Sequence, residues 1–191
     1  MNEVVKRAVF LSYSKTMEVI SRTGIARIVL PLRARMILGK FLRHAVNKIV
    51  ILDTNKPYNV FGHQMYFCHD FINLKEMAFG TYELDTVVIF REIVKPGMTV
   101  VDVGAHVGYY TLLAAKLVGS NGLVYAFEPN SEVYGILVKN IEVNGYQDIV
   151  RAIPKAVSNQ RRTVKLYIPR EDSGEASLYP LESAYKRCVE V

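Results

Sequence analysis

One stretch, residues 99–130, constrains the fold of this chain more than any other. It reads TVVDVGAHVGYYTLLAAKLVGSNGLVYAFEPN. An apolar run that ends near Asp102 is typical of a buried strand, and a loop with two glycines (104–108) follows it. A helix over 109–118 and a second strand over 123–127 complete a β-α-β pattern. This pattern predicts two parallel strands in an α/β fold.

Two carboxylates of this pattern stand where such a sheet binds ligands. The carboxyl ends of neighbouring parallel strands open a crevice, and both Asp102 and Glu128 come at such ends. Glycines let a ligand approach the backbone, and a carboxylate at the next strand's tip can bind both hydroxyls of a ribose. The pattern therefore predicts a nucleoside-binding half-fold.

The spacing of the glycines limits which nucleoside compound this loop can hold. His106 stands where the dinucleotide fingerprint G-x-G-x-x-G has its second glycine, and no lysine follows that would make a P-loop. The pattern D-x-G-x-x-x-G, with Glu128 coming 20 residues after Gly108, instead resembles the S-adenosylmethionine (SAM) site of class I methyltransferases. SAM has a ribose but no phosphate, and its ammonium and sulfonium groups favour nearby carboxylates.

Further motifs extend the resemblance to one family. They are GTYE (80–83), PGM (96–98), VVDVGAHVGYYTLLAAKLVG (100–119), VYAFEPN (124–130), LVKNI (137–141), Asn144 and AVS (156–158). Together they resemble the FkbM-type methyltransferases over about residues 58–177, most specifically over 101–129. The resemblance implies a Rossmann-like class I methyltransferase that methylates a hydroxyl of a sugar or natural product.

The pattern and the resemblance together give a set of candidate cofactor-binding residues. These are Glu83, Asp102, Gly104, Ala105, His106, Gly108, Glu128, Pro129, Asn130 and Ala156. We expect Glu128 to bind the ribose hydroxyls, Asp102 to orient the loop and the aminoacyl end, and the loop to contact SAM through its backbone. By resemblance, Glu83 is expected to reach the methionine ammonium and Ala156 to border the adenine. His106 is interpreted as an exposed loop residue beside the cofactor, and the alternatives are a hydrogen bond to the methionine moiety and a general base.

Periodicity and turn signals predict the remaining elements. Strands are expected over 98–103, 123–127 and 149–158, a hairpin around a Gly62-His63 turn, helices over 84–94 and 131–143, and a β-rich hairpin insertion at 163–169. Asn130 or Ser131 can cap the helix that follows. The fold class is therefore a doubly wound α/β sheet.

Three parts are expected along the chain: a basic helical extension (1–56), a hairpin and helix (57–97) and a SAM-binding portion (98–191). The strand K-I-D-x-E-G, which comes next in the FkbM-type family, does not occur. We therefore expect the chain to be the front part of a methyltransferase, with an unpaired apolar sheet edge and no activity by itself. A naturally minimal protein is the alternative.

Charge is concentrated in the first part. Residues 1–56 hold 11 Lys/Arg against 3 Asp/Glu, whereas residues 57–191 hold 13 against 15. Two helix-like stretches, 4–20 and 25–52, lack the ~18 uninterrupted apolar residues of a membrane span, and no signal peptide is recognisable. We expect a cap on the domain, with contact between residues 1–50 and a membrane surface as the alternative; nucleic acid is disfavoured because the cations are dispersed.

Other residues give no second chemical signal. His63, Cys68 and His69 lack the partners and the common face of a metal site, so no metal is expected. Two distant cysteines, Cys68 and Cys188, fit a reducing cytoplasm. The expected partner is a small-molecule or glycan acceptor. An RNA methyltransferase of related fold, which the basic N-terminus favours, and a non-catalytic SAM- or nucleoside-binding module are the alternatives.

Overall fold

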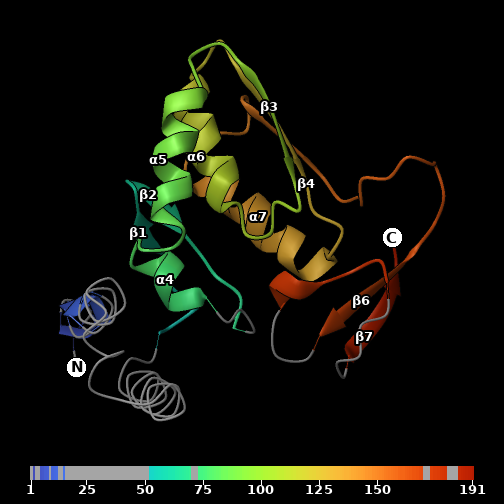
Figure 1. The fold of residues 1–191 in the computed structure, drawn as a ribbon, viewed down its shortest axis with the longest axis horizontal. Coiled ribbons are helices and arrows are strands. Elements are labelled where there is room, and N and C mark those ends of the chain that lie inside the picture. Colours follow the sequence, from blue (N-terminus) through green and yellow to red (C-terminus); the bar gives the residue numbers. More distant parts are fainter. Residues whose placement is uncertain are drawn as a thin grey trace, which may run out of the picture. The chain divides into compact units, whose positions relative to one another are not determined.

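The structure is a computed structural model that describes residues 2, 5–8, 10–12, 15, 52–69, 73–169, 173–179 and 185–191 (Figure 1). The chain divides into two compact units, residues 1–53 and 54–191. This division falls close to the end of the basic extension predicted from charge. The second unit contains every candidate cofactor-binding residue.

In the first unit, residues 5–8, 10–12 and 15 are helical, within the predicted helix over 4–20. The rest of that helix and nearly all of the predicted helix over 25–52 lie outside the described residues. Within the part of the chain that the structure describes, no helix has the length and apolar character needed to cross a membrane.

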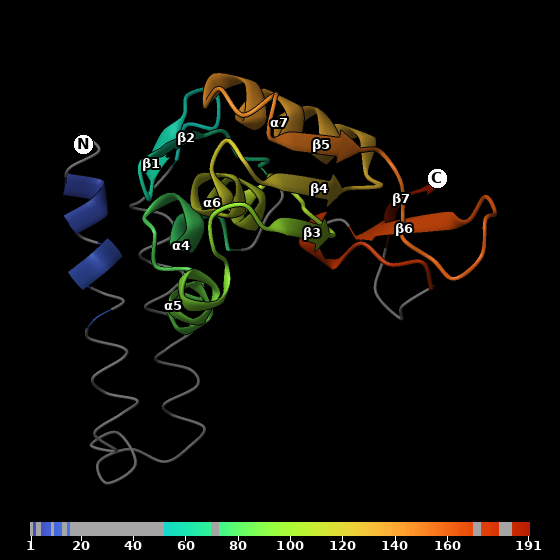
Figure 2. The ribbon, with the colours of Figure 1, turned by 90° about the horizontal axis from the view of Figure 1, so that it is seen from above.

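A three-stranded parallel sheet forms the centre of the second unit. Its strands β3 (Thr99–Val103), β4 (Leu123–Phe127) and β5 (Val150–Ile153) lie in the order β3-β4-β5. Asp102 is in register with Ala126, and Val124 with Val150. The first two strands confirm the sequence prediction, and the carboxyl ends of all three point to the same side of the unit (Figure 2).

Strand β5 is shorter than the stretch 149–158 predicted for it, which is a correction. It ends at Ile153 because Pro154 has no N–H to donate to a sheet ladder. The amide of Lys155 instead bonds the carbonyl of Ile153 at 2.9 Å, which turns the chain away from the sheet. Ala156 therefore lies in the loop beyond the strand.

Helices α6 (Tyr109–Val118) and α7 (Ser131–Val143) connect the strands and cover one face of the sheet (Figure 1). Right-handed crossovers between successive parallel strands place both helices on the same face. The core between these layers is apolar and closed: Val107, Leu112, Val124 and Leu137 are each 0% exposed. Asn130 caps α7 by accepting a hydrogen bond from the amide of Glu132 at 3.2 Å, as the sequence predicts.

A hairpin and two helices precede the sheet. Strands β1 (Tyr58–Val60) and β2 (His63–Met65) are antiparallel, and α4 (Leu74–Ala78) and α5 (Leu84–Ile93) follow. The turn is Phe61-Gly62 and not the predicted Gly62-His63. Both turn residues have positive φ, +53° and +89°, which is the conformation that a tight two-residue hairpin requires.

A second hairpin follows the sheet. Strand β6 (Lys165–Pro169) pairs antiparallel with β7 (Tyr185–Glu190), and the short helix η1 (Ser173–Glu175) lies between them in sequence. This confirms the predicted β-rich hairpin at 163–169, whereas its partner strand was not identified from the sequence. In Figure 2 the hairpin lies on the side to which the carboxyl ends of β3, β4 and β5 point.

Candidate functional site

The loop after β3 closes tightly on the tip of β4. The amides of Gly104 and Ala105 both donate to the carbonyl oxygen of Phe127, each at 2.9 Å. This bifurcated contact turns the chain over the end of the neighbouring strand. It brings the loop 104–108 directly beside Glu128, and the amide of His106 bonds that carboxylate.

Glu128 is a buried carboxylate that holds the loop in place. It is 6% exposed, and its Oε2 accepts from the amide of His106 at 2.9 Å while its Oε1 accepts from the amide of Asn130 at 2.8 Å. Burial raises the pKa of the Glu128 carboxyl above its ordinary value, the two amide donors oppose that rise, and the Asp102 carboxylate adds to it. Since a carboxylate has about four acceptor positions, the two amides leave positions for further donors.

Asp102 is anchored from the following helix. The Thr111 hydroxyl donates to Asp102 Oδ2 at 2.6 Å, and Thr111 itself is 0% exposed. Desolvation by burial raises the pKa of the Asp102 carboxyl, and hydrogen bonds from Thr111 oppose the rise. Asp102 also lines a hollow of about 260 Å³ between β3 and α5, together with Phe90 and Tyr110.

The two loop glycines have different physical roles. Gly104 has φ +77°, and a Cβ placed on it would have no heavy atom within 4 Å, so the backbone faces open space. Gly108 has φ +93°, and a Cβ on it would lie 2.8 Å from Leu137 Cδ1. Gly104 is thus the position where a ligand can approach the backbone, whereas Gly108 is needed for packing against α7.

His106 lies between these glycines with a positive φ of +51°, an uncommon conformation for a residue with a side chain. Its Nε2 lies 3.8 Å from Cys68 Sγ. The contact brings the segment after β2 next to the glycine loop. His106 is partly buried, whereas an exposed loop residue is expected from the sequence, and its place beside the cofactor stays a prediction.

The remaining candidates lie in three different places. Pro129 and Asn130 follow Glu128 directly, and Asn130 is 2% exposed. Glu83 is exposed, has φ +46°, and its Oε2 accepts from the Tyr110 hydroxyl at 2.7 Å, which connects it to the start of α6. Ala156 is not part of the Asp102–Glu128 group; it lines a separate hollow beyond β5.

The histidines and the cysteine that were weighed as metal ligands have separate partners. His63 Nε2 contacts the Tyr146 hydroxyl at 3.0 Å, His69 contacts the Thr54 hydroxyl, and Cys68 contacts His106. Across the described ranges, no group of three or more His, Cys, Asp or Glu side chains is arranged to hold a metal ion. Cys68 and Cys188 are not joined in a disulfide.

Two positioning residues were missed by sequence reasoning. Thr111 orients Asp102, and its only signal is a hydroxyl within an otherwise apolar face of α6. Asn140 is 0% exposed and uses its amide three times: Oδ1 accepts from Tyr66 N–H at 2.7 Å, and Nδ2 donates to the carbonyls of Tyr66 at 2.9 Å and Val107 at 2.8 Å. It therefore fixes the glycine loop to the segment after β2. An asparagine inside the apolar stripe of α7 was the available signal.

Comparison with known proteins decides the family. A family model described as the TRM5/TYW2 methyltransferase domain matches residues 62–166, more than half of the chain. The chain belongs to this family. A TRM5/TYW2-type domain is a class I SAM-dependent methyltransferase, with SAM as its cofactor, as the sequence pattern predicts. The match supports this class and does not support the narrower FkbM assignment.

Curated relatives and solved structures match over shorter stretches. The chain is 49% identical over 49 residues to ribosomal RNA large subunit methyltransferase E of Acinetobacter baumannii, covering 26% of this chain and 23% of that protein. It is 41% identical over 59 residues to protein-L-isoaspartate O-methyltransferase of Aeropyrum pernix, covering 31% of this chain and 23% of that protein. The TRM5/TYW2-type chain thus spans about a quarter of the length of these relatives.

Among solved structures, Trm5b from Pyrococcus abyssi has 21% identity and a TM-score of 0.39, over 52% of this chain and 27% of that chain. TYW2 from P. horikoshii in complex with MeSAdo has 27% identity and a TM-score of 0.34, over 38% of this chain and 27% of that chain.

Proposed function

We propose that this protein transfers the methyl group of SAM to RNA. The observation that carries the proposal is the TRM5/TYW2 match over residues 62–166, a region that contains all the candidate cofactor-binding residues. The similarity to a ribosomal RNA methyltransferase supports the same class of acceptor. A protein methyltransferase matches over a comparable length, so the acceptor assay below includes a protein substrate.

The residues of the crevice suit SAM in two respects. Glu128 keeps acceptor positions beyond those used by the amides of His106 and Asn130, and ribose hydroxyls are suitable donors for them. Gly104 offers open space next to its backbone. We assign Glu128 to the ribose and the backbone near Gly104 to close contact with the cofactor.

The charged candidates suit the aminoacyl end. Asp102 lies one strand away from Glu128, with its carboxylate oriented by Thr111, and Glu83 reaches the start of α6 through Tyr110. Both can attract the ammonium group of SAM. Ala156, in the loop after β5, is assigned to the adenine edge. SAM supplies an electrophilic methyl group, so the chain's own task is to position both substrates and exclude water.

A hydroxyl of a sugar or natural product is the competing acceptor, because the motifs at 80–83 and 124–130 also resemble FkbM-type methyltransferases. A module that binds SAM without catalysis is the third candidate. These three functions differ in what they do to a labelled methyl group: the first two transfer it to different acceptors, and the third retains it on the cofactor.

Acceptor labelling separates the three. Protein expressed from its own gene is incubated with methyl-tritiated SAM and, separately, with tRNA, ribosomal RNA, a glycan mixture or an isoaspartyl peptide. We expect label in RNA that ribonuclease releases, and none with the other acceptors. Label in the glycan fraction would contradict the RNA assignment. SAM binding without any transfer would support the non-catalytic module.

A further inference from the structure

A cluster of exposed cations follows β5 at the carboxyl side of the sheet. We define it as the basic loop, consisting of Lys155, Arg161 and Arg162, and all three side chains are exposed. Residues 151–165 hold five of the thirteen cations of residues 57–191 and none of its fifteen carboxylates. The other residues of 57–191 carry more carboxylates than cations. The positive charge of the basic loop is therefore a local feature of this segment.

The three cations surround one hollow. It has a volume of about 520 Å³, within the range of small-molecule and nucleotide sites. Hydroxyl and amide side chains of Ser158, Asn159, Gln160 and Thr163 complete its polar wall. Among the residues that the structure describes, the charged groups of the basic loop make no ion pair and no hydrogen bond. An external anion can therefore pair with these charges.

The hollow shares one residue with the proposed cofactor-binding set. Ala156, assigned above to the adenine edge, lines it between Lys155 and Ser158. Strand β5 carries this loop to the same side as the tips of β3 and β4 (Figure 2). A polyanion bound along the basic loop would therefore run past the carboxyl ends of the strands, where methyl transfer is proposed to occur.

We propose that the basic loop binds the phosphate backbone of the RNA acceptor and holds it beside the crevice. This inference rests on the proposed function. Arginine guanidinium groups bind phosphate oxygens in a bidentate manner, and adjacent arginines suit successive phosphates of a chain. Contacts of this kind give affinity and register without reading sequence. Nucleic-acid contact thus arises here from clustered cations in the second unit, and not from the dispersed ones of residues 1–56.

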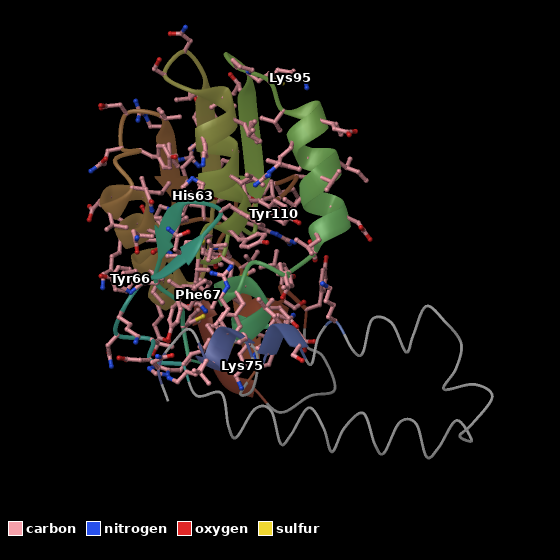
Figure 3. The ribbon with its side chains drawn as sticks, turned by 90° about the vertical axis from the view of Figure 1, so that its left-hand side faces the viewer. His63, Tyr66, Phe67, Lys75, Lys95 and Tyr110 are labelled. Carbon is pink, nitrogen blue, oxygen red and sulfur yellow. The ribbon has the colours of Figure 1, made fainter. Side chains whose placement is uncertain are left out.

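The test compares two variants with the same change in net charge. Arg161→Gln combined with Arg162→Gln removes two positive charges from the basic loop. Lys95→Glu changes the net charge equally, but Lys95 lies between α5 and the start of β3, at the amino end of the parallel sheet, whereas the basic loop follows the carboxyl end of β5 (Figure 3). Lys95 is exposed as well. Any contribution of residues 1–56 is identical in the wild type and both variants. Fluorescence anisotropy with a labelled RNA stem-loop is measured over a salt series, and SAM binding by calorimetry.

The double variant should bind RNA about tenfold more weakly. The slope of log affinity against log salt concentration should fall in magnitude by about 1 to 2, because a complex with fewer phosphate contacts releases fewer counterions. Lys95→Glu should change RNA affinity by less than about twofold, since Lys95 lies at the opposite end of the sheet from the basic loop and salt screens its charge. SAM affinity should be unchanged in both variants.

Two results would overturn the inference in distinguishable ways. Tight RNA binding by the wild type with an unchanged affinity and salt slope in the double variant would remove the basic loop from the interface and leave the RNA acceptor intact. A wild type that binds no RNA, or that binds only anionic lipid vesicles through Arg161 and Arg162, would overturn both the inference and the proposed acceptor.

Discussion

The Glu128 carboxylate acts on both the protein and the proposed ligand. It holds the amides of His106 and Asn130, and its remaining acceptor positions are available to a ribose. Glu128→Ala should therefore weaken SAM binding by roughly 2–3 kcal/mol and also lower the free energy of unfolding by roughly 1–3 kcal/mol, because two amides lose their acceptor. Titration calorimetry and urea denaturation measure these effects separately.

Glu128→Gln serves as the matched control for this change. The glutamine amide oxygen can still accept from one backbone amide, so this variant should lose less stability than Glu128→Ala. Both variants lack the charged carboxylate that would bind the ribose. Equal SAM affinity in the wild type and both variants would show that Glu128 is purely structural.

Asp102 predicts a pH dependence of stability. Burial raises the pKa of its carboxyl in the folded state, so the folded protein holds this proton more strongly than the unfolded chain does. The associated stabilisation is complete below the unfolded pKa of about 4 and is lost as the pH rises through the folded value.

Asp102→Asn abolishes this titration while its side-chain oxygen can still accept from Thr111. As the pH rises from about 4 to 7, the unfolding free energy of the wild type should therefore fall relative to that of Asp102→Asn. Urea denaturation at several pH values measures it. A difference that stays constant, or that shifts in favour of the wild type, would contradict the assignment.

Helix α7 fixes the segment around β2 with two asparagines one turn apart. Asn140 bonds the backbone of Tyr66, and Asn144 bonds that of Gln64 through its Oδ1 at 2.9 Å and its Nδ2 at 2.8 Å. Four residues along a helix cover about 6 Å, which is close to the length of two residues in an extended segment. The two side-chain amides therefore act as a short substitute for a neighbouring strand.

Asn140→Ala should lower the free energy of unfolding by roughly 2–5 kcal/mol, because it leaves several buried backbone groups without partners. Asn144→Ala is the control, since Asn144 is only partly buried and water can replace its contacts. The chemical denaturation midpoints of both variants test this order. A larger loss for Asn144→Ala would contradict the account.

Sequence reasoning predicted the elements with strong periodicity and missed the contacts that join them. The strands at 99–103 and 123–127 and the helices at 109–118 and 131–143 follow from local patterns. The contact between Asn140 and Tyr66 spans 74 residues, and no local pattern reports it. β7 was missed because its pairing with β6 depends on residues distant in sequence. The excessive length predicted for β5 was avoidable, because Pro154 was visible in the sequence.

The second unit exposes several apolar side chains on β3 and α5. β3 pairs with β4 on one edge and, among the described residues, with no strand on the other. Val101 and Val103 of β3 are 59% and 61% exposed, and on α5 Val88 and Ile93 are 56% and 64% exposed. An unpaired strand with exposed valines favours association.

The 191-residue chain should therefore associate in a concentration-dependent manner, and Val101→Lys should reduce the association by placing a charge on the exposed edge. Analytical ultracentrifugation of both proteins measures this. Lys139→Gln, away from the edge, is the control and should associate like the wild type. A wild type that remains monomeric at the same concentrations would contradict the prediction.

The central claim is that SAM binds at the carboxyl ends of β3 and β4, against the open backbone of Gly104. Two glycines allow a matched test, because Gly104 and Gly97 have similar positive φ values, +77° and +80°, and a Cβ on either would meet no atom within 4 Å. Only Gly104 borders the crevice; Gly97 precedes β3 at its opposite end.

Titration calorimetry with SAM on the wild type, Gly104→Val and Gly97→Val tests the claim most directly, with melting curves to show that both variants fold. Both should lose similar stability, about 1–2 kcal/mol, from the left-handed backbone conformation. Gly97→Val should bind SAM like the wild type, and Gly104→Val should show no measurable binding. Equal SAM affinity in the two variants would contradict the proposed cofactor site.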